Sequence, residues 1–184
     1  MTRRDLFPTP VWRIEGAPQQ LVDELYEGAY KFKEVYTDTP ERSNEGGYQT
    51  PNLKWKDFHP QGIEYVNKVV GDIFEGVSVQ SWWYNINMKN HWNVPHIHPQ
   101  CDLALVFYLT DSDGLLNLMS PFPQRRTALS KSSKENLDFI GGDHVSIRAN
   151  KGDIIMFPAD IHHFVKPNKK DTDRISISMN LQLS

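Results

Sequence analysis

Histidines and one arginine are the residues of this chain whose spacing is best suited to chemistry. His96 and His98 are separated by one residue, and a second pair, His162 and His163, follows about 65 residues later. Residues spaced like the first pair on an extended strand point to one face, so both imidazoles can reach one ion. Adjacent residues point to opposite faces, so no more than one of the second pair should join them. The pattern predicts a three-histidine metal site, and neutral imidazole suits iron, zinc, copper or nickel.

Arg174 opens a segment in which polar and apolar residues alternate. Arg174, Ser176, Ser178 and Asn180 share one face of the expected strand, and the intervening residues are apolar. Such a polar face commonly meets solvent. Arginine, however, presents a planar fork of donors that suits a carboxylate, and neighbouring hydroxyls can complete the hydrogen bonds. Together with the histidines, the segment predicts an anion anchor beside the metal.

Composition and length set the broad class. The 184 residues are enough for one domain, 1–184, that buries roughly two-thirds of its unfolded surface. A formal net charge of −3 argues against a protein built to coat nucleic acid or an acidic membrane. Cys101 is the only cysteine, and the first residues lack the apolar core of a secretory signal. We therefore expect a cytoplasmic protein with small-molecule or protein partners and no membrane span, whose oligomeric state the sequence does not predict.

Hydrophobic periodicity divides the chain into a helical part, 1–76, and a strand-rich part, 77–184. A short strand is expected over 6–14, helices near 18–33 and 61–74 should buttress a sheet, and Gly46 and Gly47 indicate a loop with unusual backbone angles. The segment 121–142 reads as a loop or lid. Strands separated by turns predict a double-sheet sandwich or barrel. The expected strands are Val77–Asn90, Asp102–Thr110, Leu115–Met119, His144–Arg148, Asp153–Phe157, His163–Lys166 and Arg174–Leu183.

Several motifs resemble those of the 2-oxoglutarate- and iron(II)-dependent oxygenases, in particular a small family found in marine bacteria and phages. The resemblance spans nearly the whole chain. It implies a mainly β fold with flanking N-terminal helices, a double-stranded β-helix or cupin-like jelly-roll barrel with iron at one mouth. The matching segments are Leu6-Phe7-Pro8-Thr9-Pro10, residues 43–49, His96-Ile97-His98-Pro99, residues 106–109, residues 157–163 and residues 174–180.

The resemblance also implies residue roles and a reaction. His96 and His163 would bind Fe(II), and His98 would stand where these oxygenases usually have an aspartate or glutamate. Arg174 would bind the distal carboxylate of 2-oxoglutarate. The expected reaction consumes O2 and 2-oxoglutarate, releases succinate and CO2, and hydroxylates a small molecule or a protein side chain. Further candidates for holding the keto acid are Ser176, Tyr108, Asn87 and Asn85.

Two other interpretations share the barrel. A cupin-like metal-binding protein without keto-acid chemistry would use Asp102 as an acidic ligand, which could join His96 and His98 only if the chain bends near Pro99. Its second motif would be Gly152, Pro158 and His163, with Asp160 in place of a glycine. This alternative does not explain Arg174. In a third interpretation the chain is a structural jelly-roll module and the histidines are incidental.

Overall fold

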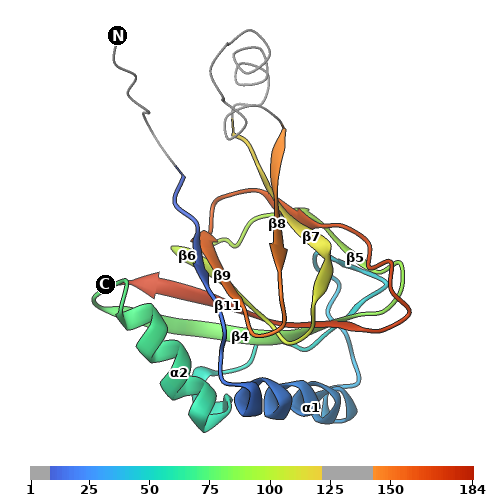
Figure 1. Ribbon diagram of the computed structural model, residues 1–184, viewed down its shortest axis with the longest axis horizontal. Helices are drawn as coiled ribbons and strands as arrows, with labels where there is room; N and C mark the ends of the chain where they lie inside the picture. The colour runs from blue at the N-terminus through green and yellow to red at the C-terminus, as the bar shows by residue number, and fades with distance from the viewer. Residues whose placement is uncertain (1–8, 122–142) are drawn as a thin grey trace, which may run out of the picture.

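Two sheets of antiparallel strands make up most of the computed structural model, which describes residues 9–121 and 143–184 (Figure 1). The larger sheet contains, in spatial order, β1 (Trp12–Ile14), β9 (Ile154–Pro158), β6 (Leu103–Tyr108), β11 (Arg174–Leu183), β4 (Val77–Asn87) and β3 (Tyr48–Gln49). The smaller sheet contains β2 (Asn44–Glu45), β5 (Trp92–His96), β10 (His163–Val165), β7 (Ser112–Met119) and β8 (His144–Ala149). The predicted mainly β class is confirmed, but the sheets remain separate and do not close into a barrel.

Two helices cover the outer face of the larger sheet (Figure 1). They are α1 (Gln19–Val35) and α2 (Pro60–Gly71), close to the predicted ranges, and a short 3-10 turn, Trp55–Asp57, precedes α2. Each helix buries one stripe, which includes Leu21 and Leu25 in α1 and Val66 in α2. Neither helix in the described ranges has the length and apolarity that a membrane span requires. The helices therefore pack their apolar side chains against this face of the larger sheet.

The central strands of the larger sheet are buried on both faces. In β6, Leu105 and Phe107 pack toward the helices, whereas Val106 and Tyr108 pack toward the smaller sheet. Successive side chains of a strand point to opposite faces, so a sheet covered on both sides needs almost continuous burial. The same alternation places Ile175 and Ile177 of β11 against the helices. The polar face of β11 is thereby directed between the two sheets rather than into solvent.

The strands predicted after residue 77 are all present, with the predicted ends for Arg174–Leu183 and shifted ends for the others, but the sequence did not reveal β5. This strand contains Pro95, which lacks a backbone donor and disfavours strand interiors. The proline is tolerated because the pairing of β5 with β10 is irregular between His163 and Val165. Strands β2 and β3, before residue 77, were also not predicted, and Gly46 between them has a φ of 70° that suits glycine. The expected loop over 121–142 lies outside the described residues except for its first residue.

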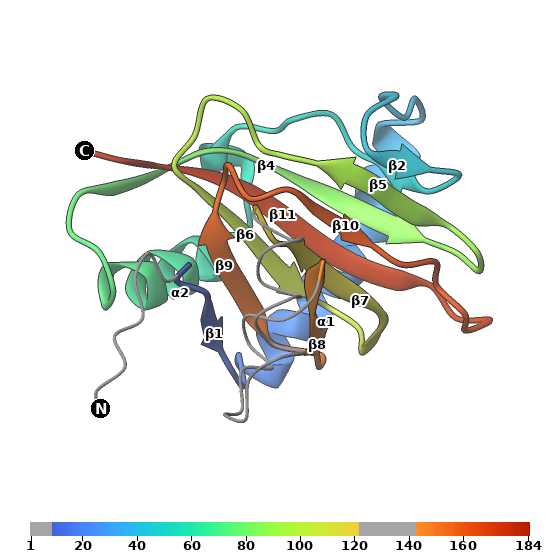
Figure 2. The ribbon, with the colours of Figure 1, turned by 90° about the horizontal axis from the view of Figure 1, so that it is seen from above.

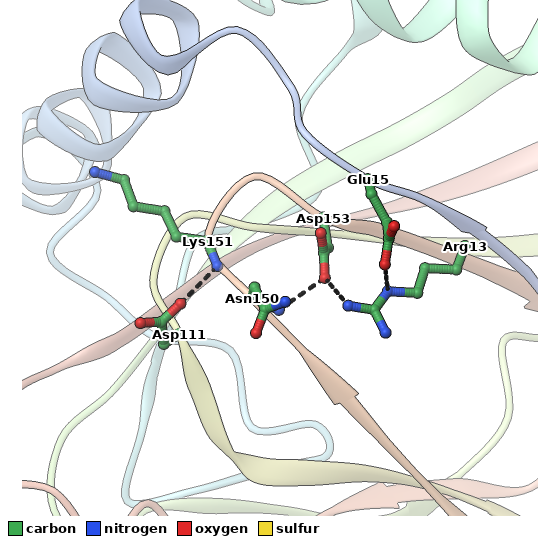
Figure 3. Close-up of polar contacts among 6 residues, drawn as sticks. All are labelled: Arg13, Glu15, Asp111, Asn150, Lys151 and Asp153. Carbon is green, nitrogen blue, oxygen red and sulfur yellow. Dashed lines mark hydrogen bonds and ion pairs between the residues drawn. The ribbon is translucent and has the colours of Figure 1, made fainter.

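A buried carboxylate fastens the N-terminal strand to the rest of the larger sheet (Figure 3). Asp153, which is 3% exposed, accepts hydrogen bonds from the Arg13 guanidinium at 2.7 Å and from the backbone N–H of Asn150 at 2.8 Å. Arg13 also pairs with Glu15 at 3.0 Å. The contact joins β1 to the turn that leads into β9, beside which β1 lies (Figure 2). Arg13 therefore compensates a charge that would otherwise be buried alone.

Replacing Arg13 by alanine should destabilise the protein by about 1–2 kcal/mol. The change leaves the Asp153 carboxylate buried without its cation, and partial access of water to the Arg13 site reduces the cost. Urea unfolding of Arg13→Ala against the wild type measures this. Lys68→Ala is the matched control, because Lys68 pairs with Asp72 on an exposed helix face and should contribute no more than about 0.5 kcal/mol. Equal effects of the two changes would contradict a special role for Arg13.

Candidate metal and anion site

Three histidines from two segments of the chain converge between the two sheets. His96 ends β5, His98 follows two residues later, and His163 begins β10, where it pairs directly with His96. One ring nitrogen from each residue lies within 4.8 Å of the other two. The ring centroids are 4.2 Å apart for His96 and His163, and 5.1 Å apart for His98 and His163. This arrangement is compact enough for all three to bind one metal ion.

The hydrogen bonds of the three rings leave the same nitrogen free in each. The Nδ1 atoms of His96 and His163 lie 2.7 Å and 2.9 Å from the backbone carbonyl oxygens of Val94 and Ile161. A carbonyl oxygen only accepts, so each Nδ1 carries the proton and each Nε2 keeps a lone pair. His98 Nδ1 lies 2.6 Å from Oδ1 of Asn180, also an acceptor. All three imidazoles can therefore present Nε2 to a metal while a hydrogen bond on the other nitrogen orients the ring.

Burial keeps the histidines neutral. Desolvation lowers the pKa of His96, brings the pKa of His98 to about 4 and brings that of His163 to about 3. For His98 and His163 the neighbouring imidazoles contribute to this lowering of the pKa, since protonated rings so close together would repel each other. Near neutral pH the cluster is consequently in the form that binds metals.

Arg174 lies in the same cavity and is buried, with no carboxylate counter-ion among the residues that the structure describes. The residue is 6% exposed, and its Nη1 donates to the backbone oxygen of Lys166 at 3.0 Å. Within residues 9–121 and 143–184 it forms no ion pair with a carboxylate. Burial lowers the pKa of Arg174 to about 10, a shift that neighbouring Tyr108 partly opposes, so the guanidinium still carries its charge at neutral pH. A buried cation left unpaired is costly, and an anionic ligand would compensate it.

Most of the predicted site residues line this cavity. His96, His98 and His163 are joined there by Arg174, Ser176 and Tyr108. Burial raises the pKa of Tyr108 to about 12, so its hydroxyl remains a donor at neutral pH. The cavity is also lined by Ser43, Trp83, Asn85, Asn93, Val106, Leu116, Val165 and Ser178.

Asn87 lies behind the cavity wall rather than in it. The residue is 2% exposed, and its Nδ2 donates to Oδ1 of Asn93 at 3.1 Å. Sequence reasoning did not identify Asn93, which belongs to the unrecognised strand β5. It also assigned no role to Asn180, although that residue stood at the end of the recognised polar face. His162 is exposed, so the two adjacent histidines do face different surroundings, as expected from strand geometry.

Asp102 does not join the histidines. Its carboxylate accepts hydrogen bonds from the backbone N–H of Leu183 at 2.8 Å and from the side chain of Gln182. The chain turns just before it, at Gln100, where φ is 65°. The bend considered in the sequence therefore exists, but it directs Asp102 to the end of β11. The cupin-like interpretation loses its acidic ligand for this reason.

The metal-free protein should lose stability as the pH falls below about 6.5, the ordinary pKa of histidine. His98 and His163 remain neutral in the folded state, so between that value and their folded pKa values the unfolded chain binds more protons. The loss should reach about 1.4 kcal/mol per pH unit for each histidine. Urea unfolding from about pH 7 to about pH 5 in chelator tests this. The double variant His98→Gln with His163→Gln should show a shallower slope, and an unchanged slope would refute the account.

Comparison with solved structures identifies the fold. HygX from Streptomyces hygroscopicus, solved with nickel and 2-oxoglutarate, has a TM-score of 0.67 at 12% identity, with 96% of this chain and 84% of that chain covered. The viral collagen prolyl hydroxylase vCPH from Paramecium Bursaria Chlorella virus-1, a 2-oxoglutarate complex, gives 0.63 at 14% identity, with 95% and 96% covered. SnoK, a non-heme alpha-ketoglutarate-dependent carbocyclase from nogalamycin biosynthesis, gives 0.66 at 14%, with 95% and 80% covered. These likenesses confirm the expected double-stranded β-helix fold.

The family follows from the sequence itself. No curated protein matches the chain. The model of the family described as "Putative 2OG-Fe(II) oxygenase" matches residues 81–180, more than half of the chain, and this range includes the three histidines and Arg174. The chain belongs to this family and is a 2-oxoglutarate- and Fe(II)-dependent oxygenase.

Proposed function

We propose that this enzyme hydroxylates a small molecule or a protein side chain while it converts 2-oxoglutarate to succinate and CO2. The observation that carries the proposal is that one cavity holds both the neutral histidine cluster and the buried cation of Arg174. A metal site alone would suit many functions. A cation in the same cavity, with no counter-ion among the described residues, supports a second ligand that is anionic and able to approach the metal.

His96, His98 and His163 are the proposed ligands of Fe(II). Imidazole nitrogen suits iron, and the remaining coordination positions are left for other ligands. The bound iron would supply activation of O2 together with the keto acid. The protein's part is to hold three ring nitrogens in fixed directions through the acceptors at their Nδ1 atoms. It also surrounds them with Trp83 and Phe157, which contact the rings of His98 and His163 and limit access of water.

Arg174 is the proposed partner of the distal carboxylate of 2-oxoglutarate. Ser176 lies next but one along β11, and Tyr108 is paired opposite Ser176 on β6, so their hydroxyl groups border the same region. Both can donate hydrogen bonds to a carboxylate, whose oxygens only accept. Asn87 would act indirectly, by holding Asn93 in the cavity wall. This arrangement supports binding of a dicarboxylate with one end at the metal and the other at Arg174.

His98 stands where these oxygenases usually have a carboxylate, and this distinguishes the proposed site. Three neutral ligands contribute no negative charge, and Asp102 is engaged elsewhere. The keto acid would then supply the negative charge that approaches the metal. We propose that metal and keto acid bind more interdependently here than in a site with an acidic ligand.

The range of proposed substrates rests on the structural relatives. HygX has been solved with hygromycin B bound, and vCPH is named a collagen prolyl hydroxylase. One is a complex with a small molecule and the other name refers to a protein substrate. This supports both classes for the present enzyme.

His163→Ala should weaken binding of Fe(II), or of Co(II) as a probe, by more than about 100-fold. Even residues that only orient a metal ligand contribute about 10- to 100-fold, and a ligand should contribute more. Anaerobic competition with a coloured chelator measures the affinity. His162→Ala is the control, because this exposed neighbour should leave the affinity unchanged. Comparable losses in the two variants would argue against His163 as a ligand.

Anaerobic addition of 2-oxoglutarate to the iron(II)-loaded enzyme should produce the weak visible charge-transfer band of a chelated keto acid. Arg174→Ala should weaken 2-oxoglutarate binding by about 10- to 100-fold, which corresponds to loss of charge-assisted hydrogen bonds, while metal affinity is retained. Arg148→Ala, which removes an exposed arginine of β8, is the control. Undiminished keto-acid affinity in Arg174→Ala would overturn the assignment of Arg174. Absence of the band with iron bound would overturn the proposed function.

A further inference from the structure

His98 differs from the other two histidines in the group that holds its Nδ1 atom. His96 and His163 use backbone carbonyls two residues earlier in the chain, so substitution of a side chain cannot remove these acceptors. His98 uses the side chain of Asn180, which lies 82 residues away in the sequence and on the larger sheet. The orientation of His98 therefore depends on one replaceable residue.

We propose that Asn180 is a positioning residue that holds His98 in the tautomer with the proton on Nδ1 and the lone pair of Nε2 directed to the metal. The inference rests on the proposed role of His98 as a metal ligand and extends it to a residue outside the ligand set. Asn180 itself would not contact the metal. It would act through His98, with its amide oxygen as the acceptor of the Nδ1 proton.

Packing fixes the plane of the His98 ring but does not choose between its two nitrogens. The ring stacks on Trp83 with centroids 5.5 Å apart and an interplanar angle of 28°, and the His98 backbone N–H donates to the carbonyl of Ala159 at 2.9 Å. A stacked imidazole turned by 180° about its Cβ–Cγ bond fills nearly the same space. A directed hydrogen bond distinguishes the two orientations, and among the described residues the His98 ring makes such a bond to Asn180.

The tautomer matters because only an unprotonated nitrogen can bind a metal. With the Asn180 oxygen against Nδ1, the proton resides on Nδ1 and Nε2 is free. If the amide nitrogen faced the ring instead, Nδ1 would have to accept, and the proton would move to Nε2, where it would block the metal. An acceptor at position 180 is thus required for His98 to serve as a ligand through Nε2.

Local strand geometry favours this placement of Asn180. Asn180 pairs with Ser81 and the following Leu181 pairs with Val79, so β4 has one extra residue, Gln80, at this point. Such bulges are frequent beside functional sites, where they redirect side chains. On the β11 side the alternation continues undisturbed, and Asn180 faces the smaller sheet as Ser176 and Ser178 do. The strand that carries Arg174 at one end therefore carries the support of a metal ligand near the other.

The experiment compares Asn180→Leu, which has a similar size but no acceptor, with Asn180→Asp, which retains an acceptor and adds a charge. The first measurement is the tautomer of His98 in the metal-free protein, from the nitrogen-15 shifts of its imidazole. We expect the Nδ1-protonated form in the wild type and in Asn180→Asp, and a shift toward the Nε2-protonated form in Asn180→Leu. The Nε2-protonated form in the wild type would overturn the proposal without any variant.

The second measurement is Co(II) affinity by competition with a coloured chelator. Asn180→Leu should bind Co(II) about 10- to 100-fold more weakly than the wild type. Asn180→Asp should bind it at least as tightly as the wild type, because a carboxylate at Nδ1 makes the imidazole a more basic metal ligand. Gln182→Ala is the control, since this amide of the same strand bonds to Asp102 outside the cavity. Wild-type affinity and tautomer in folded Asn180→Leu would overturn the proposal. His98→Ala separates the two hypotheses, because unchanged affinity there would refute the ligand assignment itself.

Discussion

The alternation of side chains along β11 is the constraint on which the site depends. This strand lies in the interior of the larger sheet, between β6 and β4, so both of its faces are covered. Its apolar residues complete the core beneath the helices, and its polar residues must then face the smaller sheet. A shift of one residue would exchange the two faces and bury the polar residues under the helices. The hydrophobic core thus holds Arg174 and Asn180 in position, and the catalytic arrangement is inseparable from the packing.

Burial of the polar groups has opposite consequences for histidine and arginine. The histidines avoid the cost of buried charge by losing their protons, and in this neutral form they are able to bind a metal. Arg174 stays charged at neutral pH, and no carboxylate within residues 9–121 and 143–184 compensates its burial. The cavity therefore combines the positive charge of Arg174 with neutral imidazoles, and burial acts on the candidate metal site and the candidate anion site in different ways. Binding of an anionic cosubstrate would relieve the cost that folding leaves at Arg174.

With His98 as the proposed ligand in place of the usual carboxylate, the hydrogen-bond partners at this position must change as well. A carboxylate ligand is held by hydrogen-bond donors, whereas an imidazole that binds through Nε2 must give its Nδ1 proton to an acceptor. Asn180 has such an acceptor, and it connects a ligand that follows the smaller sheet with the central strand of the larger sheet. Because this contact spans the two sheets, the orientation of the His98 ring depends on the distance between them.

Local signals in spacing or alternation were enough to predict the mainly β class, the two helices, the polar face of β11 and the three histidines with Arg174. Contacts between residues far apart in the chain, and departures from regular strand pairing, could be seen only in the folded protein. Pro95 argues against a strand at β5 in the sequence, and the irregular pairing of β5 with β10 explains how the strand accommodates it. On a regular strand Asp102 would lie on the same face as His96 and His98, yet the turn at Gln100 directs it to the end of β11. Asn87 shares the parity of cavity residues but lies behind Asn93, and Asn180 reaches His98 across 82 residues. Contacts of this kind depend on how two sheets pack, and no local pattern encodes that packing.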